Sequence, residues 1–160
     1  MRYVLIDRIT TLDPGRSLSG FKNVSLSDDL VMRQAPGVSV LPASMVLEAM
    51  AQAAGLLVVA SLRAATQPVL AKVQPFTSHV PAVAGDRLDL HAQLEDLRAE
   101  GAKVRVTAAI ESQLAAEATI YLALVALDAP EHVDRVALLR ERLTDTFPGW
   151  FAIDAVGMHS

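Results

Sequence analysis

Two polar side chains interrupt the most apolar segment of this sequence. Glu48 and Gln52 lie between Pro42 and Leu62. Burying an unpaired carboxylate costs several kcal/mol, so a glutamate in this setting needs a reason. One reason is proton transfer, for which a carboxylate held beside a substrate is suited. The alternative is a structural glutamate that is satisfied by neighbouring backbone or by a partner subunit.

Composition excludes several other kinds of chemistry. The chain has no cysteine, which excludes disulfides, thiolate catalysis and cysteine-ligated metal centres. A net charge of -4 gives no electrostatic footprint for nucleic acid. The four histidines, His79, His91, His132 and His159, are not at metal-ligand spacing. His91 falls on the polar face of a predicted strand, which indicates a surface position. We therefore expect neither a metal site nor a cofactor.

The apolar segment is long enough to cross a membrane, which takes about 20 residues. An acidic residue near the bilayer centre costs about 3 kcal/mol on insertion scales, however, and Glu48 lies inside the segment. An all-round apolar helix is more typical of a protein core. The sequence therefore predicts a buried central helix over Pro42–Ala65 and no membrane span. Because no apolar h-region follows the first residues, we also expect a cytoplasmic protein without a signal peptide.

The segments around this helix predict a sheet. Tyr3–Leu12 and Ser17–Leu26 are predicted to form a hairpin, because Asp-Pro-Gly-Arg between them is a typical turn. Ser27–Leu41 is expected to be irregular. After the helix, alternating apolar and polar residues predict four further strands: Val69–Ser78, Arg87–Leu97, Lys103–Glu111 and Ala118–Leu127. The segment 82–86 is expected to be a turn.

This order of elements predicts one α+β domain over residues 1–128, in which an antiparallel six-stranded sheet wraps around the long helix. Residues 129–160 are expected to add a charged amphipathic helix over Glu131–Thr146 and a short aromatic tail. We expect this C-terminal part to pack on the domain or on a partner subunit.

Five short segments resemble one known family. They are LIDRI (5–9), FKNVS (21–25), APG (35–37), LEAMAQAAGLL (47–57) and AGDRL (84–88). Together they make the stretch from Val4 to Leu127 similar to the beta-hydroxyacyl-acyl-carrier-protein dehydratases of fatty-acid synthesis, which have the hot-dog fold. The resemblance implies a hot-dog fold, a thioester of acyl carrier protein or coenzyme A as ligand, and a dimer whose two sheets join edge to edge.

In that family a histidine removes the α-proton of a 3-hydroxyacyl thioester, and a helix carboxylate handles the departing water. The helix N-terminus polarises the thioester carbonyl. The carboxylate corresponds to Glu48, but the histidine position is occupied by Gln34, whose amide is neutral and not basic. A second departure is an alanine where the family has glycine at the helix start. By the same resemblance, the residues expected to contact substrate are Gly37, Pro42, Ala43 (the departure), Ser44 and Gln52.

The missing base leaves three functions open. The first is a dehydratase homologue of fatty-acid or polyketide-type metabolism whose activity alone is weak or lost, because losing a general base costs about 10²–10⁴-fold in rate. The second is a non-catalytic subunit that completes one site with a histidine-bearing relative, since the family's two catalytic residues come from opposite protomers. Homodimer and heterodimer both remain open. The third is a hot-dog thioesterase in which Glu48 activates water.

Overall fold

The structure is a computed structural model that describes residues 4–62, 66–126, 141 and 145–147 of the chain. Its elements are β1 (Arg8–Asp13), β2 (Ser17–Asn23), β3 (Met32–Ala35), β4 (Val38–Leu41), α1 (Ala43–Ser61), β5 (Thr66–Ser78), β6 (Ala82–Val83), β7 (Arg87–Leu97), β8 (Gly101–Ile110) and β9 (Gln113–Ala126).

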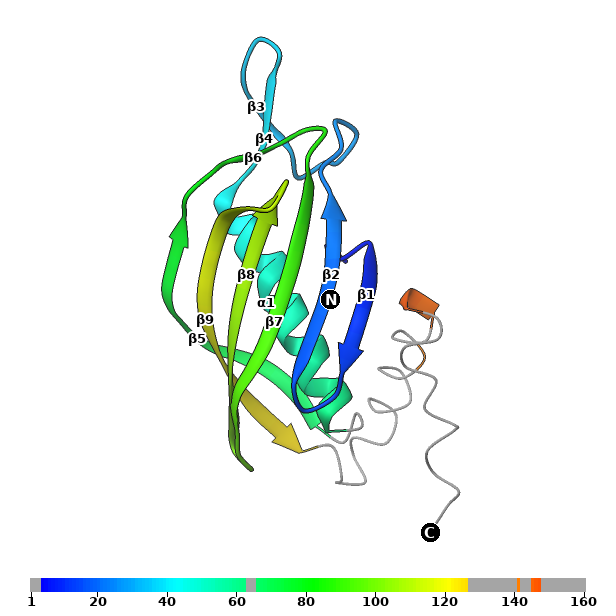
Figure 1. The fold of residues 1–160 in the computed structure, drawn as a ribbon, viewed down its shortest axis with the longest axis vertical. Helices are drawn as coiled ribbons and strands as arrows, with labels where there is room; N and C mark the ends of the chain where they lie inside the picture. Colours follow the sequence, from blue (N-terminus) through cyan, green and yellow to red (C-terminus); the bar gives the residue numbers. More distant parts are fainter. Residues whose placement is uncertain (1–3, 63–65, 127–140, 142–144, 148–160) are drawn as a thin grey trace.

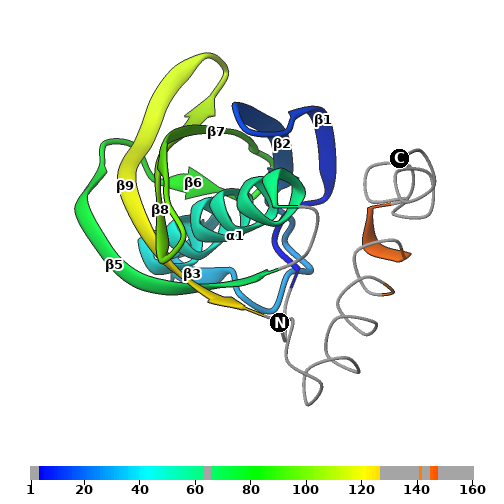
Figure 2. The ribbon, with the colours of Figure 1, turned by 90° about the horizontal axis from the view of Figure 1, so that it is seen from below.

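Six strands form one antiparallel sheet that curls around the helix (Figure 1, Figure 2). Their order is β1-β2-β7-β8-β9-β5, and every neighbouring pair is antiparallel. Alternate side chains of β7 and β8 are buried, among them Leu88, Leu90 and Val104. The predicted six-stranded sheet around a long helix is therefore confirmed, and β7 has the predicted bounds.

The helix α1 is the core of this arrangement. Met50, Ala53 and Leu57 have no exposed surface, and α1 contacts β2, β5, β7, β8 and β9. Pro42 precedes the first turn with φ of -55°, as suits the start of a helix. By length and composition this one helix could cross a membrane, but 56% of its most apolar window is buried inside the protein. It is a core helix of the domain.

A second, small sheet corrects the prediction for Ser27–Leu41. Instead of irregular chain, β3 and β4 form a hairpin there, and β6, within the expected turn 82–86, pairs with β4. Figure 1 shows the hairpin extending beyond the N-terminal end of α1. All four residues of β3 are exposed, so the strand has no buried face to produce an alternating pattern. Its sequence therefore gave no strand signal.

Several boundaries also differ from those predicted. The first strand begins at Arg8 rather than Tyr3, and the second ends at Asn23 rather than Leu26. The segment before β1 is still tied to the fold, since the backbone N–H of Asp7 donates to the carbonyl of Phe21. Nearly all of the predicted C-terminal helix and tail lies outside the described residues. Phe147 is described there, and at 4% exposure it belongs to the hydrophobic core.

The last strand of the sheet, β5, has one open edge, because β9 is its partner in the described sheet. Val69 and Leu70 on this strand are 45% and 50% exposed. Pro68 and Pro75 interrupt its row of backbone donors, as is typical of an edge strand. The strand opposite, β1, ends the other side of the sheet.

Candidate functional site

A cavity of about 240 Å³ lies where the small sheet, the start of α1 and the end of β5 meet. Most of the residues that line it are apolar. The residues that line it are Gln34, Val40, Leu41, Pro42, Ala43, Val46, Ser78, His79, Val80, Pro81 and Ala82. The structure thus brings together three residues that the sequence proposed for the site, namely Gln34, Pro42 and Ala43.

Gln34 reaches the cavity from an irregular point of the β3–β4 hairpin. The register between these strands shifts between Arg33 and Ala35, so Gln34 has no opposite residue on β4. Such bulges re-aim a side chain and are common beside active sites. Gly37 closes the hairpin with φ of +77°, a conformation that favours glycine, and it does not line the cavity. Its observed role is to form the turn that carries Gln34.

The start of α1 supplies hydrogen-bond donors at the cavity wall. The carbonyl of Pro42 accepts bonds from the N–H groups of Met45 and Val46. The N–H groups of Ala43 and Ser44 come before the first intrahelical bonds, so they are free of the ladder. Together with the partial positive charge of the helix start, they can stabilise negative charge on a carbonyl oxygen. Ala43 lines the cavity, whereas Ser44 is exposed beside it.

Glu48 lies outside this cavity, on the exposed part of α1. The expectation that the apolar helix buries its carboxylate is therefore wrong for the single chain. The sheet leaves this part of α1 uncovered, so no desolvation cost arises there. Within one chain, the structure does not bring Gln34 and Glu48 into the same cavity.

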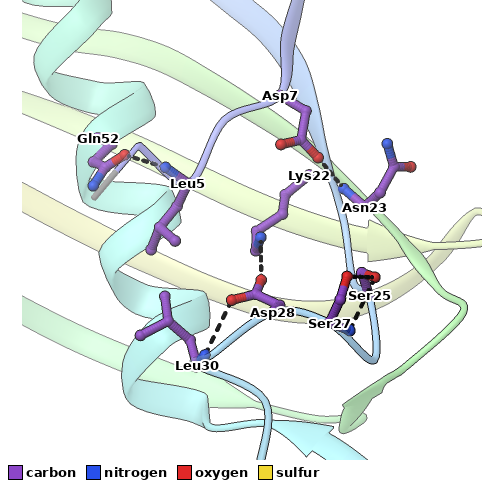
Figure 3. A network of polar contacts seen from close by, with 9 residues as sticks. All are labelled: Leu5, Asp7, Lys22, Asn23, Ser25, Ser27, Asp28, Leu30 and Gln52. Atoms are coloured by element: carbon purple, nitrogen blue, oxygen red, sulfur yellow. Dashed lines mark hydrogen bonds and ion pairs between the residues drawn. The ribbon is translucent and has the colours of Figure 1, made fainter.

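Gln52 holds the Glu48 carboxylate in place. Its Oε1 accepts a bond of 2.8 Å from the buried N–H of Leu5, and its Nε2 donates to Glu48 Oε1 at 3.1 Å. The bond from Leu5 fixes which end of the amide carries oxygen, so the NH₂ end must face Glu48. Figure 3 shows Gln52 on α1 turned toward Leu5 in the segment before β1. The side chain proposed to contact substrate is 7% exposed and engaged inside the protein.

A buried ion pair fixes the loop that leads into β3. Lys22 Nζ, on a side chain that is 6% exposed, lies 2.7 Å from Asp28 Oδ2 (Figure 3). Partial burial works to raise the pKa of Asp28. Hydrogen bonds from Lys22 and from the N–H of Leu30, with the positive charge of Lys22, outweigh it and lower the pKa below its ordinary value. This contact anchors the chain just before the hairpin that bears Gln34.

Of the two described histidines, His79 lines the cavity and His91 does not. His79 belongs to the cavity wall, but its Nε2 lies 3.1 Å from Glu117 Oε1. Glu117 is opposite Thr77 across the β5–β9 ladder, so the side chains of Thr77 and Glu117 point to the outer face of the sheet. His91 is exposed, as predicted, with Nδ1 2.9 Å from Ser19 Oγ. Among the described residues, no group of His, Asp and Glu is placed to hold a metal ion.

Ser78 is a cavity residue that the sequence did not single out. It ends β5 opposite Ala116, which is 1% exposed on the inner face of the sheet. Opposite residues of an antiparallel pair lie on the same side of the sheet, so Ser78, although exposed, is on the side that faces the cavity. A serine at the end of a strand carries no sequence signal of its own. Its place in the cavity becomes evident only in the structure, where the end of β5 lies beside the start of α1.

Comparison with known proteins places these observations in a family context. Residues 1–120 match the family model described as a FabA-like domain. The 3-hydroxyacyl-acyl-carrier-protein dehydratase FabZ of Nitratidesulfovibrio vulgaris is 36% identical over 124 residues, covering 74% of this chain and 79% of that protein. The FabZ of Symbiobacterium thermophilum is 33% identical over 130 residues, covering 81% and 92%.

Solved structures share the fold at low identity. The smu.793 protein of Streptococcus mutans, bound to acetyl CoA, superposes with a TM-score of 0.66 at 14% identity, over 79% of this chain and 94% of that one. The thioesterase HI1161 of Haemophilus influenzae gives a TM-score of 0.62 at 15% identity, over 76% and 80%. These similarities concern the fold alone.

Proposed function

The chain belongs to the FabA-like family of hot-dog proteins that includes the FabZ dehydratases, and from this membership we propose that it binds 3-hydroxyacyl thioesters but dehydrates them weakly or not at all by itself. The carrier would be acyl carrier protein or coenzyme A. The observation that supports the proposal is the cavity at the start of α1, because it is lined by Gln34, the residue at the position where the family resemblance implies a catalytic histidine.

Dehydration of a 3-hydroxyacyl thioester needs three contributions. A base takes a proton from the α-carbon, donors stabilise the enolate oxygen that develops, and an acid gives a proton to the leaving hydroxyl so that water departs. In our proposal the free N–H groups of Ala43 and Ser44 receive the thioester oxygen. Glu48 is the acid. Gln34 can hydrogen-bond the substrate, but its neutral amide cannot take the proton, and the imidazole of His79 is engaged by Glu117.

The exposed position of Glu48 favours a dimer as the working form. Because Gln34 and Glu48 do not share a cavity in one chain, a complete site would need the carboxylate of a second subunit. The open edge of β5, with Val69 and Leu70 exposed, offers a place for that subunit to continue the sheet. A histidine-bearing relative in this position would form one site with its own histidine and the Glu48 of this chain. This heteromeric role is our second candidate function.

The test is to incubate the purified protein with 3-hydroxyacyl and saturated acyl thioesters, each on acyl carrier protein and on coenzyme A, and to follow the masses of the acyl groups. We expect no rapid loss of water from the wild type. The Gln34→His variant should dehydrate the 3-hydroxyacyl thioesters faster than the wild type, by up to about 10²–10⁴-fold, because it restores a base at the cavity.

Three other outcomes would change the conclusion. Robust dehydration by the wild type would show that another group supplies the base and would overturn our interpretation of Gln34. Loss of the whole acyl group would indicate a thioesterase. Dehydration that appears only after mixing with a FabZ relative, and that depends on Glu48 in this chain, would support the heteromeric role.

A further inference from the structure

The cavity at the start of α1 combines apolar residues with three polar ones, the neutral Gln34 and Ser78 and the histidine His79, whose Nε2 lies 3.1 Å from Glu117 Oε1. Gln34 enters from β3 and Ser78 from β5, while no carboxylate or ammonium group lines it. The remaining wall is formed largely by aliphatic side chains and prolines, which suit a hydrocarbon chain. Gln34 and Ser78 are therefore placed to select a ligand by hydrogen bonding rather than by charge.

The hydroxyl of Ser78 is available to such a ligand. It makes no hydrogen bond to any of the described residues, and its place on the side that faces the cavity follows from the pairing of Ser78 with buried Ala116. The next residue back, Thr77, pairs with Glu117 and points to the outer face. The two neighbouring hydroxyl groups thus lie on opposite faces of the same strand, and only one of them can reach the cavity.

We propose that Ser78 acts with Gln34 as a specificity-determining residue that recognises an oxygen atom on C3 of a bound acyl chain. This inference rests on the proposed function, because it assumes that an acyl thioester occupies the cavity. A hydroxyl and a carboxamide each offer a donor and an acceptor, so the pair can bind either a 3-hydroxyl or a 3-oxo group. A saturated chain would leave both groups without that partner.

The proposed role of Ser78 predicts a difference in binding affinity among acyl chains, not a change in reaction rate. One net hydrogen bond corresponds to about threefold to tenfold in affinity. Two such bonds predict that a 3-oxygenated chain binds about tenfold to a hundredfold more tightly than a saturated chain of equal length. Because a site built around hydrogen bonds discriminates against analogues that lack the polar group, Ser78 should affect the ratio of affinities far more than the binding of the saturated chain.

The experiment measures dissociation constants for butyryl, 3-hydroxybutyryl and 3-oxobutyryl groups, each on coenzyme A and on acyl carrier protein. The wild type is compared with Ser78→Ala and with the matched control Thr77→Ala, which removes a hydroxyl from the outer face. Ser78→Ala should reduce the preference for both oxygenated chains by about threefold to tenfold, whereas Thr77→Ala should leave it unchanged. Mass spectrometry after each titration verifies that the acyl group is intact.

The possible failures are distinguishable. If the wild type binds all three acyl groups equally, or if Ser78→Ala retains the full preference, the role of Ser78 is refuted while thioester binding stands. If none of the ligands binds on either carrier, the proposed function fails and the inference fails with it. If only the 3-oxo group is preferred, the site recognises an acceptor at C3 and a 3-hydroxyl is not its ligand.

Discussion

Replacing Gln52 by methionine tests how much the hydrogen bonds of the Gln52 side chain stabilise the fold. The substitution keeps a side chain of similar length in a 7% exposed site, but it removes the acceptor of the Leu5 N–H and the donor to Glu48. Leaving a buried N–H unpaired costs about 1–3 kcal/mol, and Leu5 itself is 2% exposed. For a domain of this size, that loss lowers the melting temperature by roughly 2–12 °C.

The assay combines urea unfolding with hydrogen exchange at the Leu5 amide. We expect Gln52→Met to lower the free energy of unfolding by the stated amount and to speed exchange at Leu5, because its N–H loses its acceptor. Unfolding within about 0.5 kcal/mol of the wild type, with Leu5 still protected, would refute the reasoning, since surface substitutions typically stay within that range.

A reciprocal exchange isolates the contact between the two side chains. Gln52→Glu retains an acceptor for Leu5 but places a second carboxylate against Glu48, so it should destabilise the protein at pH 7. Adding Glu48→Gln restores a donor and an acceptor in reversed order. The double variant should therefore recover most of the lost stability. If it is no more stable than Gln52→Glu alone, the contact between the two side chains does not position Glu48.

Three further predictions follow from the site and the sheet edge. Glu48→Gln should abolish any dehydration by homodimers or mixed dimers. Because Glu48 is exposed, the same change should alter the free energy of unfolding by less than about 0.5 kcal/mol. Unchanged turnover in every assembly would make Glu48 a structural residue. Asp28→Asn should destabilise the protein by about 1.5–3 kcal/mol at pH 7, because Lys22 would lose its charged partner. The pKa of Asp28 is lowered in the folded protein, so the loss of unfolding free energy in Asp28→Asn should be largest above the unfolded carboxyl pKa of 3.8 and should shrink as the pH falls below it. Urea unfolding of both proteins at several pH values measures this trend. Sedimentation should give twice the 17.1 kDa protomer mass at micromolar concentration, and Leu70→Asp on β5 should shift it toward the monomer; a monomeric wild type contradicts the edge-to-edge dimer.

The sequence predicted the elements whose burial leaves a periodic pattern. The bounds of β7 match because Leu88, Leu90 and Ala92 alternate between polar residues and are buried on one face. The helix was identified by its length and its apolar surface on all sides. The β3–β4 hairpin was missed because β3 is exposed throughout and because β4 pairs with β6, which lies far along the chain. Such pairing leaves no local signal.

The sequence also predicted part of the candidate site. Gln34, Pro42 and Ala43 stand in motifs, and the structure brings all three to one cavity. The exposure of Glu48 could not be deduced, since an all-round apolar helix does not reveal which side its sheet leaves uncovered. Ser78 depends on the register between β5 and β9, which the sequence does not specify.

The prolines of β5 have a consequence for how this protein avoids uncontrolled aggregation. An open edge of this length is a template on which any extended chain could grow. Pro68 lies within the β5–β9 ladder, opposite Leu124, so its missing N–H is a gap on the free side of the strand. Pro75 lies in an irregular stretch, and Lys72 adds a positive charge between the two. A strand that adds here must therefore tolerate the missing donor of Pro68, the irregular stretch at Pro75 and a lysine, which admits a matched subunit and discourages the uniform hydrogen-bond ladder of a fibril.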